Sequence, residues 1–166
     1  MSSPGPLIDP HAFTREACEI SKTLPMTAFA RLSQAAFERR GEVSYAVRGW
    51  AESDGKMWLE LEASGSLVLQ CQRCLEALDW AFSVANRLLL VPEGRGLPDD
   101  ELQEDDWDAV SVGSRLDLAG MVEDEVLLAL PIAPRHEECR APAGSDGMDQ
   151  SSPFAALAKL RNADKA

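Results

Sequence analysis

The sequence predicts an α+β fold in which an antiparallel β-meander of three or more strands packs against two or three helices. Three observations lead to this expectation. Apolar and polar side chains alternate along three segments between residues 43 and 90, as in strands with one buried face. Two other stretches, 26–40 and 114–130, repeat apolar residues at helical spacing. With 166 residues, 45% of them hydrophobic, the chain suits a single globular domain, which we assign to residues 1–139.

The N-terminal part of the chain is expected to hold a loose segment followed by a helix. Residues 1–12 are rich in serine, proline and glycine, which disfavour regular structure, although the stretch IDPHAF at 8–13 could lie along an edge. From Met26 to Arg40 apolar residues recur every three or four positions, Thr27 is suited to cap a helix, and Gly41 is suited to end it. This pattern predicts the first helix.

The three alternating segments predict the strands of the meander, with one side of the sheet packed and the other wet. Asp54 and Gly55 favour a tight hairpin turn between the first and second strands. The turn between the second and third strands contains Cys71 and Cys74. The apolar sets that define the packed side are Val43, Tyr45 and Val47, then Met57, Leu59, Leu61, Ala63, Leu67 and Leu69, and then Leu78, Trp80, Phe82, Val84, Leu88 and Leu90.

Residues 92–108 are expected to form an extended acidic loop. They hold eight carboxylates against one arginine, together with two prolines. A solvated linker is the simplest interpretation of this composition, and the acids do not follow the spacing of a calcium-binding loop.

A second helix is expected after this loop and is closed by Pro131. Ser114 and Asp117 form an S-x-x-D start, which places an acid near the positive end of the helix. The middle of this helix carries three consecutive acids, Glu123, Asp124 and Glu125. They have no basic residue four positions on, so a solvated face is expected, and a partner-binding face is the alternative.

The C-terminal part of the chain is expected to be a tethered helix. Residues 140–152 have the composition of a flexible linker, and residues 153–166 predict a short helix and a tail, with Ser152 and Pro153 at its start. The face of this helix would present Phe154, Leu157 and Leu160. A helix this short needs a surface to pack on, which either the protein's own core or a partner would supply.

The pair Cys71 and Cys74 leaves three interpretations open. A C-x-x-C turn supplies two zinc ligands, and His136 and Cys139 form a second pair with the same spacing, so a Cys3His zinc site is one interpretation. The 61 residues between the pairs exceed ordinary zinc-ribbon spacing, and ordinary thiols in a hairpin turn are the second interpretation. A redox pair is the third, and it is disfavoured because a strand pattern, not a helix, follows Cys74.

The motifs of common enzymes are missing from the sequence. It has two histidines, His11 and His136, and no G-x-S-x-G, phosphate-binding glycine loop or H-E-x-x-H. We therefore expect a protein that is not an enzyme, with zinc as its only candidate cofactor.

The charge balance bears on the kind of partner. The chain has 28 acidic against 16 basic residues and a net charge of −12, which favours a basic protein partner over a nucleic acid; solubility alone is the other explanation. Four cysteines do not suggest a disulfide scaffold, the N-terminus lacks the pattern of a secretory signal, and the apolar runs are too short to span a membrane. We expect a cytoplasmic protein without membrane contact.

Three stretches of the sequence together resemble the YceD family, bacterial proteins named for accumulation of the RNA of the large ribosomal subunit. They are CQRCL at 71–75, DLAGMVEDEVLLALPIAPRH at 117–136 and SPFAALAKL at 152–160, of which the second is the most specific. The resemblance implies a cytoplasmic factor for synthesis, processing or stability of 23S rRNA, with no established catalytic activity. Relatives are commonly encoded beside a large-subunit ribosomal protein, which implies a role in assembly. Some relatives carry extra cysteines after the helix, where this chain has only His136 and Cys139.

Charge and resemblance together predict a ribosomal protein or an assembly intermediate of the large subunit as the partner. A basic ribosomal protein would be bound by Glu123, Asp124, Glu125 and the carboxylates of 99–108, with apolar contacts from Phe154, Leu157 and Leu160. The alternative is a factor that binds rRNA directly through a local patch of Arg31, Arg39, Arg40, Arg73 and Arg87.

Overall fold

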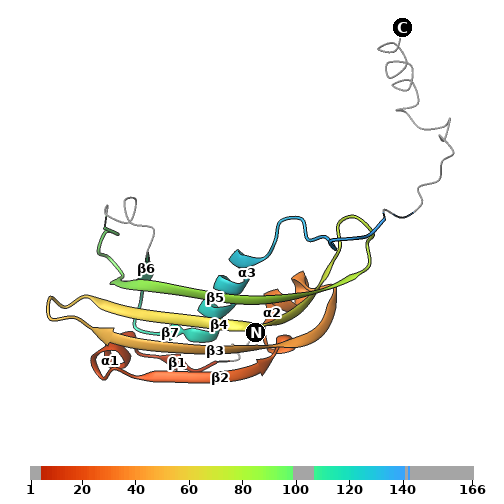
Figure 1. Cartoon of the computed structure of the whole chain (residues 1–166). Helices are drawn as coiled ribbons and strands as arrows, with labels where there is room; N and C mark the ends of the chain where they lie inside the picture. The colour runs from red at the N-terminus through yellow and green to blue at the C-terminus, as the bar shows by residue number, and fades with distance from the viewer. Residues whose placement is uncertain (1–4, 99–106, 141, 143–166) are drawn as a thin grey trace, which may run out of the picture.

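The computed structural model describes residues 5–98, 107–140 and 142, which form a long curved sheet with helices packed against it (Figure 1). The elements in chain order are β1 (Leu7–Ile8), α1 (Pro10–Arg15), β2 (Glu19–Pro25), the 3-10 turn η1 (Met26–Ala28), α2 (Ala30–Ala35), β3 (Glu38–Ala51), β4 (Met57–Gln70), β5 (Ala77–Pro92), β6 (Asp108–Val112), β7 (Leu116–Asp117) and α3 (Leu118–Ala129). The predicted α+β fold is confirmed.

The main sheet has the strand order β2-β3-β4-β5-β6. Strands β2 to β5 form an antiparallel meander, as predicted, whereas β6 pairs with β5 in parallel. The two-residue strands β1 and β7 pair separately. The sequence did not predict β2, β6 or β7, because none of them carries a run of strictly alternating apolar residues.

The packed side of the sheet is the one that the alternation predicts. Val43, Tyr45 and Val47 in β3 and every second residue from Met57 to Ala63 in β4 are buried. Helix α3 contacts β4 and β5 and buries Val122 in this core. Residues of the three long strands β3, β4 and β5 and of helix α3 thus contribute to one buried core.

The other side of the sheet was predicted to be exposed to solvent, but it is not exposed throughout. A small second cluster forms there from Trp58, Leu89 and Val91, with Trp50 packed against it. The rings of Trp50 and Trp58 stack with centroids 6.3 Å apart, and the guanidinium of Arg87 lies 4.6 Å from the Trp58 ring. These tryptophans bury an otherwise exposed end of the sheet.

The helix predicted over 26–40 is wrong beyond residue 35. The 3-10 turn η1 and the short helix α2 take its place, and β3 begins at Glu38. Met26, Phe29 and Leu32 are fully buried from these two turns, which explains the helical spacing. Gly41 does not end a helix but lies in a bulge of β3 with φ +124°, where a Cβ would lie 2.1 Å from the Ser66 carbonyl oxygen.

The loose N-terminus predicted for residues 1–12 is also wrong within the described part. Leu7 and Ile8 form β1, and α1 follows directly. Asp9 caps α1, because its carboxylate accepts hydrogen bonds from the backbone N–H groups of His11 and Ala12 at 2.9 and 3.3 Å. Phe13 from this helix packs on Gly49 of β3, where a Cβ would lie 2.6 Å from its ring.

Helix α3 begins three residues later than predicted. Its N-cap is Asp117, whose carboxylate accepts from the Gly120 N–H at 3.1 Å, and not Ser114. Pro131 follows its end, as predicted. No described helix has the length and apolar composition needed to cross a membrane.

Three predicted segments are only partly described or not described. Of the acidic loop 92–108, Pro92 belongs to β5 and Asp108 to β6, while residues 99–106 lie outside the described residues. The same is true of most of the linker 140–152 and of the whole predicted C-terminal helix 153–166 with Phe154, Leu157 and Leu160.

Candidate metal centre

The turn between β4 and β5 holds the two cysteines of the C-x-x-C motif in a fixed geometry. The Leu75 N–H donates to the Cys71 carbonyl, and the Cys71 N–H donates to the Glu76 carbonyl, both at 2.9 Å. Leu75 takes the left-handed conformation with φ +65°, which reverses the chain before β5. The turn thus presents the side chains of Cys71 and Cys74 to one side.

The segment after α3 docks against this turn through backbone contacts. The Gln72 N–H donates to the Pro134 carbonyl at 2.8 Å. One guanidinium nitrogen of Arg73, Nη2, donates to the carbonyls of His136 and Glu137 at 2.9 and 3.3 Å. These bonds bring His136 and Cys139 to the cysteines of the turn, although more than sixty positions separate the two pairs.

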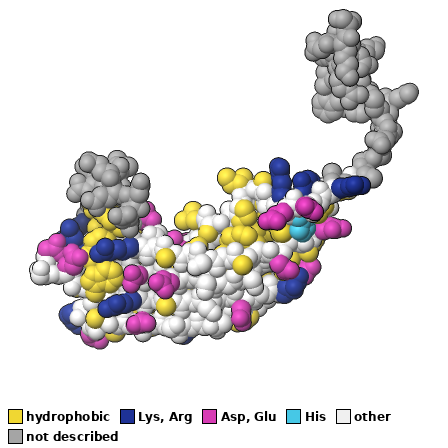
Figure 2. Space-filling model, viewed as in Figure 1, with side chains coloured by type: hydrophobic (Ala, Val, Ile, Leu, Met, Phe, Trp, Pro, Cys, Tyr) yellow, Lys and Arg dark blue, Asp and Glu magenta, His cyan; other side chains and the backbone are white. Residues whose placement is uncertain are grey.

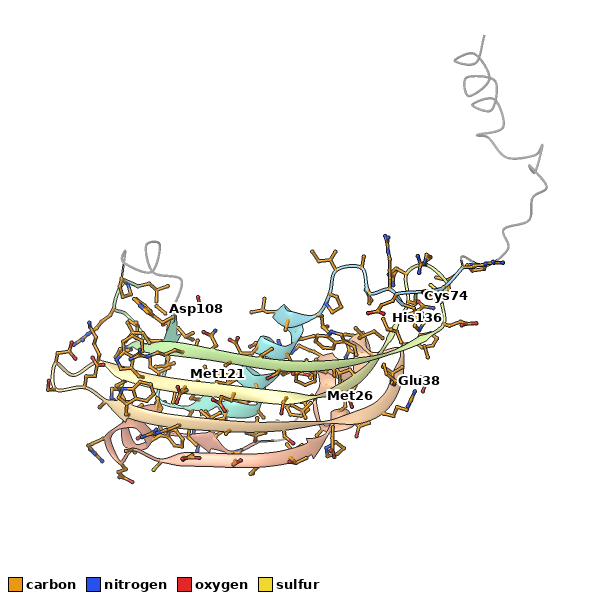
Figure 3. The ribbon with its side chains drawn as sticks, in the orientation of Figure 1. Met26, Glu38, Cys74, Asp108, Met121 and His136 are labelled. Carbon is orange, nitrogen blue, oxygen red and sulfur yellow. The ribbon has the colours of Figure 1, made fainter. Side chains whose placement is uncertain are left out.

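The four predicted ligands come together as a cluster. The Sγ atoms of Cys71, Cys74 and Cys139 and a ring nitrogen of His136 all lie within 4.8 Å of one another. The Cys71 and Cys139 Sγ atoms are 3.7 Å apart, and Cys74 Sγ is 3.3 Å from His136 Nδ1. Figure 3 shows Cys74 and His136 side by side at the end of the sheet where β4 turns into β5.

The spacing of these atoms fits a tetrahedral zinc site. Zinc–sulfur bonds of about 2.3 Å and zinc–nitrogen bonds of about 2.0 Å place neighbouring ligand atoms roughly 3.5 to 3.8 Å apart. The distances of 3.7 and 3.3 Å agree with this to a few tenths of an ångström. Three thiols and one imidazole also form a donor set that favours zinc over calcium or magnesium, which prefer oxygen ligands. The residues present can therefore hold a zinc ion.

The ring of His136 is oriented by a contact outside the cluster. Its Nε2 lies 3.1 Å from the carbonyl oxygen of Ala77, the first residue of β5. A carbonyl accepts only from an N–H, so this contact puts the proton on Nε2 and leaves the Nδ1 lone pair directed at the thiols. Metal-binding histidines are commonly held in this way.

The protonation of the thiols favours metal binding at Cys71. Burial disfavours its thiolate, but the backbone N–H groups of Cys74, His136 and Arg73 point to its sulfur, and they lower the pKa of Cys71 to about 5. At Cys74 the Glu76 N–H favours the thiolate, but burial and the thiols of Cys71 and Cys139 outweigh it and raise the pKa of Cys74. A cation between the three sulfurs would relieve this crowding of charge.

Arg73 supplies a positive charge next to the cluster. Its Nε donates to Cys139 Sγ at 2.9 Å. A zinc ion with three thiolates and one neutral imidazole carries a net charge of about −1, and the guanidinium offsets it. The sequence placed Arg73 in the motif but gave no sign that its side chain turns back to Cys139.

A redox role finds no support in this geometry. β5 begins three residues after Cys74, so the motif lies between two strands and not at the start of a helix, where a thiolate would be stabilised for redox chemistry. All four cysteines of the chain are free thiols. Cys18 lies outside the cluster and packs, half-buried, against the core.

The three acids of α3 do not share one environment. The expectation of a solvated face is wrong for Glu123, which is buried and accepts from the backbone N–H groups of Arg31 and Leu32 at 2.6 and 3.0 Å. Asp124 is exposed and pairs with Arg31, and Glu125 is half-buried. The side chain of Arg31, a member of the alternative RNA-binding patch, links Glu123 and Asp124.

No pattern in the sequence points to a role for Asn86 of β5. Its Nδ2 donates to Asp108 at 2.8 Å and to Glu125 at 3.1 Å. Burial and the nearby charges of Asp108 and Asp124 raise the pKa of Glu125, against the effect of the Asn86 hydrogen bond. The end of the acidic loop and the exposed side of α3 thus form one acidic surface, made of Asp108, Asp124 and Glu125.

Fold and site together define the class: a small α+β protein in which a Cys3His cluster of the zinc-binding type joins a hairpin turn to the segment after a helix. The model of one protein family, described as "Large ribosomal RNA subunit accumulation protein YceD", matches residues 59–161, more than half of the chain. The chain therefore belongs to the YceD family, as the three sequence stretches predicted. Its description names an effect on ribosomal RNA and no catalysed reaction. Comparison with curated proteins and with solved structures found no match.

Proposed function

We propose that the protein is a cytoplasmic, non-enzymatic factor that supports synthesis, processing or stability of large-subunit (23S) rRNA by acting through a basic ribosomal protein. The family description supports the link to this RNA. The net charge of −12 supports a cationic protein as the direct partner, because an RNA-binding surface would need clustered positive charge.

The observation that carries this proposal is the acidic surface around Asn86. Because Asn86 donates to both Asp108 and Glu125, Asp108 lies beside the acids of α3. The sequence adds further carboxylates between residues 99 and 106, which lie outside the described residues. Burial raises the pKa of Glu125, and the neighbouring charges of Asp108 and Asp124 act in the same direction. Lysine or arginine side chains of a partner would compensate them. Glu125 is proposed as a contact, and Asp124 as a second one that would exchange its pairing with Arg31 for a cation of the partner, while Glu123 is occupied within the protein.

A zinc ion at Cys71, Cys74, His136 and Cys139 belongs to the same proposal. It would fix the segment after α3 to the β4–β5 turn. All four ligands come from the protein, which is typical of structural zinc sites and not of catalytic ones, where water or substrate occupies one position.

Direct RNA binding through an arginine patch is the weaker candidate, because most of the five arginines are already engaged. Arg31 pairs with Glu123 and Asp124, and Arg40 with Glu38 and Asp79. Arg73 contacts Cys139, and Arg87 stacks on Trp50 and Trp58. Arg40 and Arg87 also lie far apart along the sheet. Arg40 precedes Gly41, which pairs with Leu67 of β4, whereas Arg87 pairs with Glu60 of the same strand. Leu67 and Glu60 are seven residues apart, or roughly 24 Å along β4. These two arginines do not form one patch.

The proposal is tested with immobilised full-length protein and RNA-free ribosomal proteins extracted from large subunits. We expect retention of basic proteins that declines between about 50 and 500 mM salt, since screening weakens such contacts. Asp108→Asn combined with Glu125→Gln should lower retention several-fold at low salt. Glu60→Gln combined with Glu62→Gln, on the exposed face of β4, removes the same charge elsewhere and should change it little.

Two results would contradict the proposal. One is equal loss of retention in the two double variants, which would reduce the effect to net charge. The other is tight binding of purified 23S rRNA at physiological salt without protein, lost on substitution of Arg39, the member of the predicted patch that takes part in none of the contacts given above.

A further inference from the structure

A hollow edged by exposed apolar side chains lies next to the metal centre, between the end of α2, the end of β4 and the segment after α3. Its volume is about 340 Å³, and its lining includes Ala36, Phe37, Leu69, Leu130 and Ile132. Phe37 is 46% exposed and Ile132 fully exposed. Figure 2 shows the hydrophobic side chains gathered on this upper edge of the molecule, over the end of α3 and the segment that follows it. Large apolar side chains that are exposed close together are typical of an interaction surface.

This hollow is held open by backbone contacts on several sides. The Phe37 N–H donates to the Val68 carbonyl at 2.8 Å, which fixes the start of β3 against β4. The Gln72 N–H donates to the Pro134 carbonyl at 2.8 Å, which fixes the segment after α3. Gln72 and Pro134 both line the hollow, so its rim is shared with the metal centre.

We propose that residues 153–161 of the same chain dock into this hollow. The first argument is reach. Cys139 lies 3.7 Å from Cys71, whose neighbour Gln72 lines the hollow, so the chain passes near the rim at Cys139, three residues before Pro142. The ten residues 143–152 then span at most about 35 Å when extended, and roughly 17 Å as a flexible coil. Tethering at this range gives an effective concentration of the order of millimolar, so a modest intrinsic affinity is sufficient.

The second argument is chemical fit. Phe154, Leu157 and Leu160 recur at a spacing that places them on one face of a helix, which suits an apolar groove between existing elements. Lys159 and Arg161 flank this face, and Glu137 and Glu138 are exposed three and four residues beyond Pro134 at the rim. The family match runs from residue 59 to residue 161, so it includes the end of β4 and the segment after α3, which line the hollow, and the whole docking segment, but not the end of α2.

This inference does not depend on the proposed ribosomal role, and it is tested in the full-length protein without a partner. Ile132 is replaced by the photoreactive residue benzoylphenylalanine, which the fully exposed position should tolerate. Irradiation of dilute protein should give a product of monomer size, with the crosslink mapped by mass spectrometry to residues 153–161. Leu157→Glu should lower its yield about tenfold or more, because burial of one leucine supports at least that factor. Asn162→Ala, just outside the docking segment, should leave the yield nearly unchanged.

Benzoylphenylalanine at Leu97, an apolar residue 50% exposed near the end of β5, serves as the control for nonspecific contact. The proposal is overturned if position 97 captures residues 153–161 as efficiently as position 132. It is equally overturned by crosslinks that join two copies of the chain, which would make a second copy the occupant, or by a yield that Leu157→Glu does not change.

Discussion

Glu123 is the acid of α3 whose loss should destabilise the protein most. Its side chain is 9% exposed and accepts from two backbone N–H groups, those of Arg31 at 2.6 Å and Leu32 at 3.0 Å, and from Arg31 Nε at 3.0 Å. The carboxylate thus satisfies the first turn of α2 from a helix that lies about ninety positions further along the chain. The substitution Glu123→Ala removes all three contacts.

The magnitude follows from what the substitution leaves unpaired. Two N–H groups lose their acceptor at the packed interface of α2 and α3, which costs about 1–3 kcal/mol each. Arg31 is half exposed and keeps its contact with Asp124, so the lost ion pair contributes about 1 kcal/mol at most. We expect Glu123→Ala to lower the free energy of unfolding by about 3–5 kcal/mol. Glu123→Gln keeps one acceptor oxygen and the volume, and should lower it by about 1–2 kcal/mol.

The assay is urea unfolding followed by the fluorescence of the four tryptophans. The midpoint should shift while the slope stays constant, which separates a loss of stability from a change in the unfolded state. Asp124→Ala is the matched control, because it removes an exposed acid that pairs with the same Arg31, and it should change stability by less than about 1 kcal/mol. Equal midpoints for Glu123→Ala and Asp124→Ala would refute the reasoning.

Three further predictions concern the metal centre and the acidic surface. Cys74→Ser should abolish stoichiometric zinc measured by elemental analysis of the purified protein, whereas Cys18→Ser, outside the cluster, should retain it; zinc in both variants, or in neither wild type nor Cys18→Ser, would contradict the assignment. Arg73→Met should weaken zinc binding about 10- to 100-fold in competition with a chromophoric chelator, because the donor to Cys139 is lost, and unchanged affinity would show that the contact is incidental. Glu125 has a pKa raised above the unfolded value, so the folded state holds its proton more tightly and its contribution to stability is lost as pH rises through the folded pKa. Glu125→Gln should therefore stabilise the protein at neutral pH, within about 1 kcal/mol for such a half-exposed site, and have no such effect below the unfolded pKa; a gain that persists in acid would exclude this cause.

The parts of the fold that could be predicted are those that a local pattern determines. The alternation in β3, β4 and β5 specifies which face is buried, since a shift of one residue would expose the whole apolar set. β2 could not be predicted, because only Ile20 and Leu24 pack against the core from it and its pairing with β3 comes from the rest of the sheet. The helical spacing of Met26, Phe29 and Leu32 was real, but one long helix and two short turns bury such a set equally well.

The candidate site divides in the same way between local and distant information. The C-x-x-C turn and the second pair were visible as ligand types, and the structure brings all four together. What closes the cluster is the contact of Arg73 with Cys139 and that of His136 with the Ala77 carbonyl, and neither has a signature in sequence spacing. Glu123 was misjudged for the same reason, because its partner Arg31 is distant in the chain and a charge run on a helix is ordinarily solvated.

Glu123 holds α3 itself, whereas the Cys3His cluster holds the segment that follows α3, and this difference bears on what a metal would do here. Glu123 fixes the body of the helix to α2, and Leu118, Val122 and Val126 bury it in the core without help from the cluster. The cluster instead holds the irregular segment after Pro131, which is also tied by the Gln72 N–H, by the Arg73 guanidinium and by the contact of His136 Nε2 with the Ala77 carbonyl. A metal bound by four protein ligands would therefore contribute little to the folding of α3 and much to the position of residues 132–140. Ile132 and Pro134 of this segment line the hollow, so the ion would help to determine the shape of that surface.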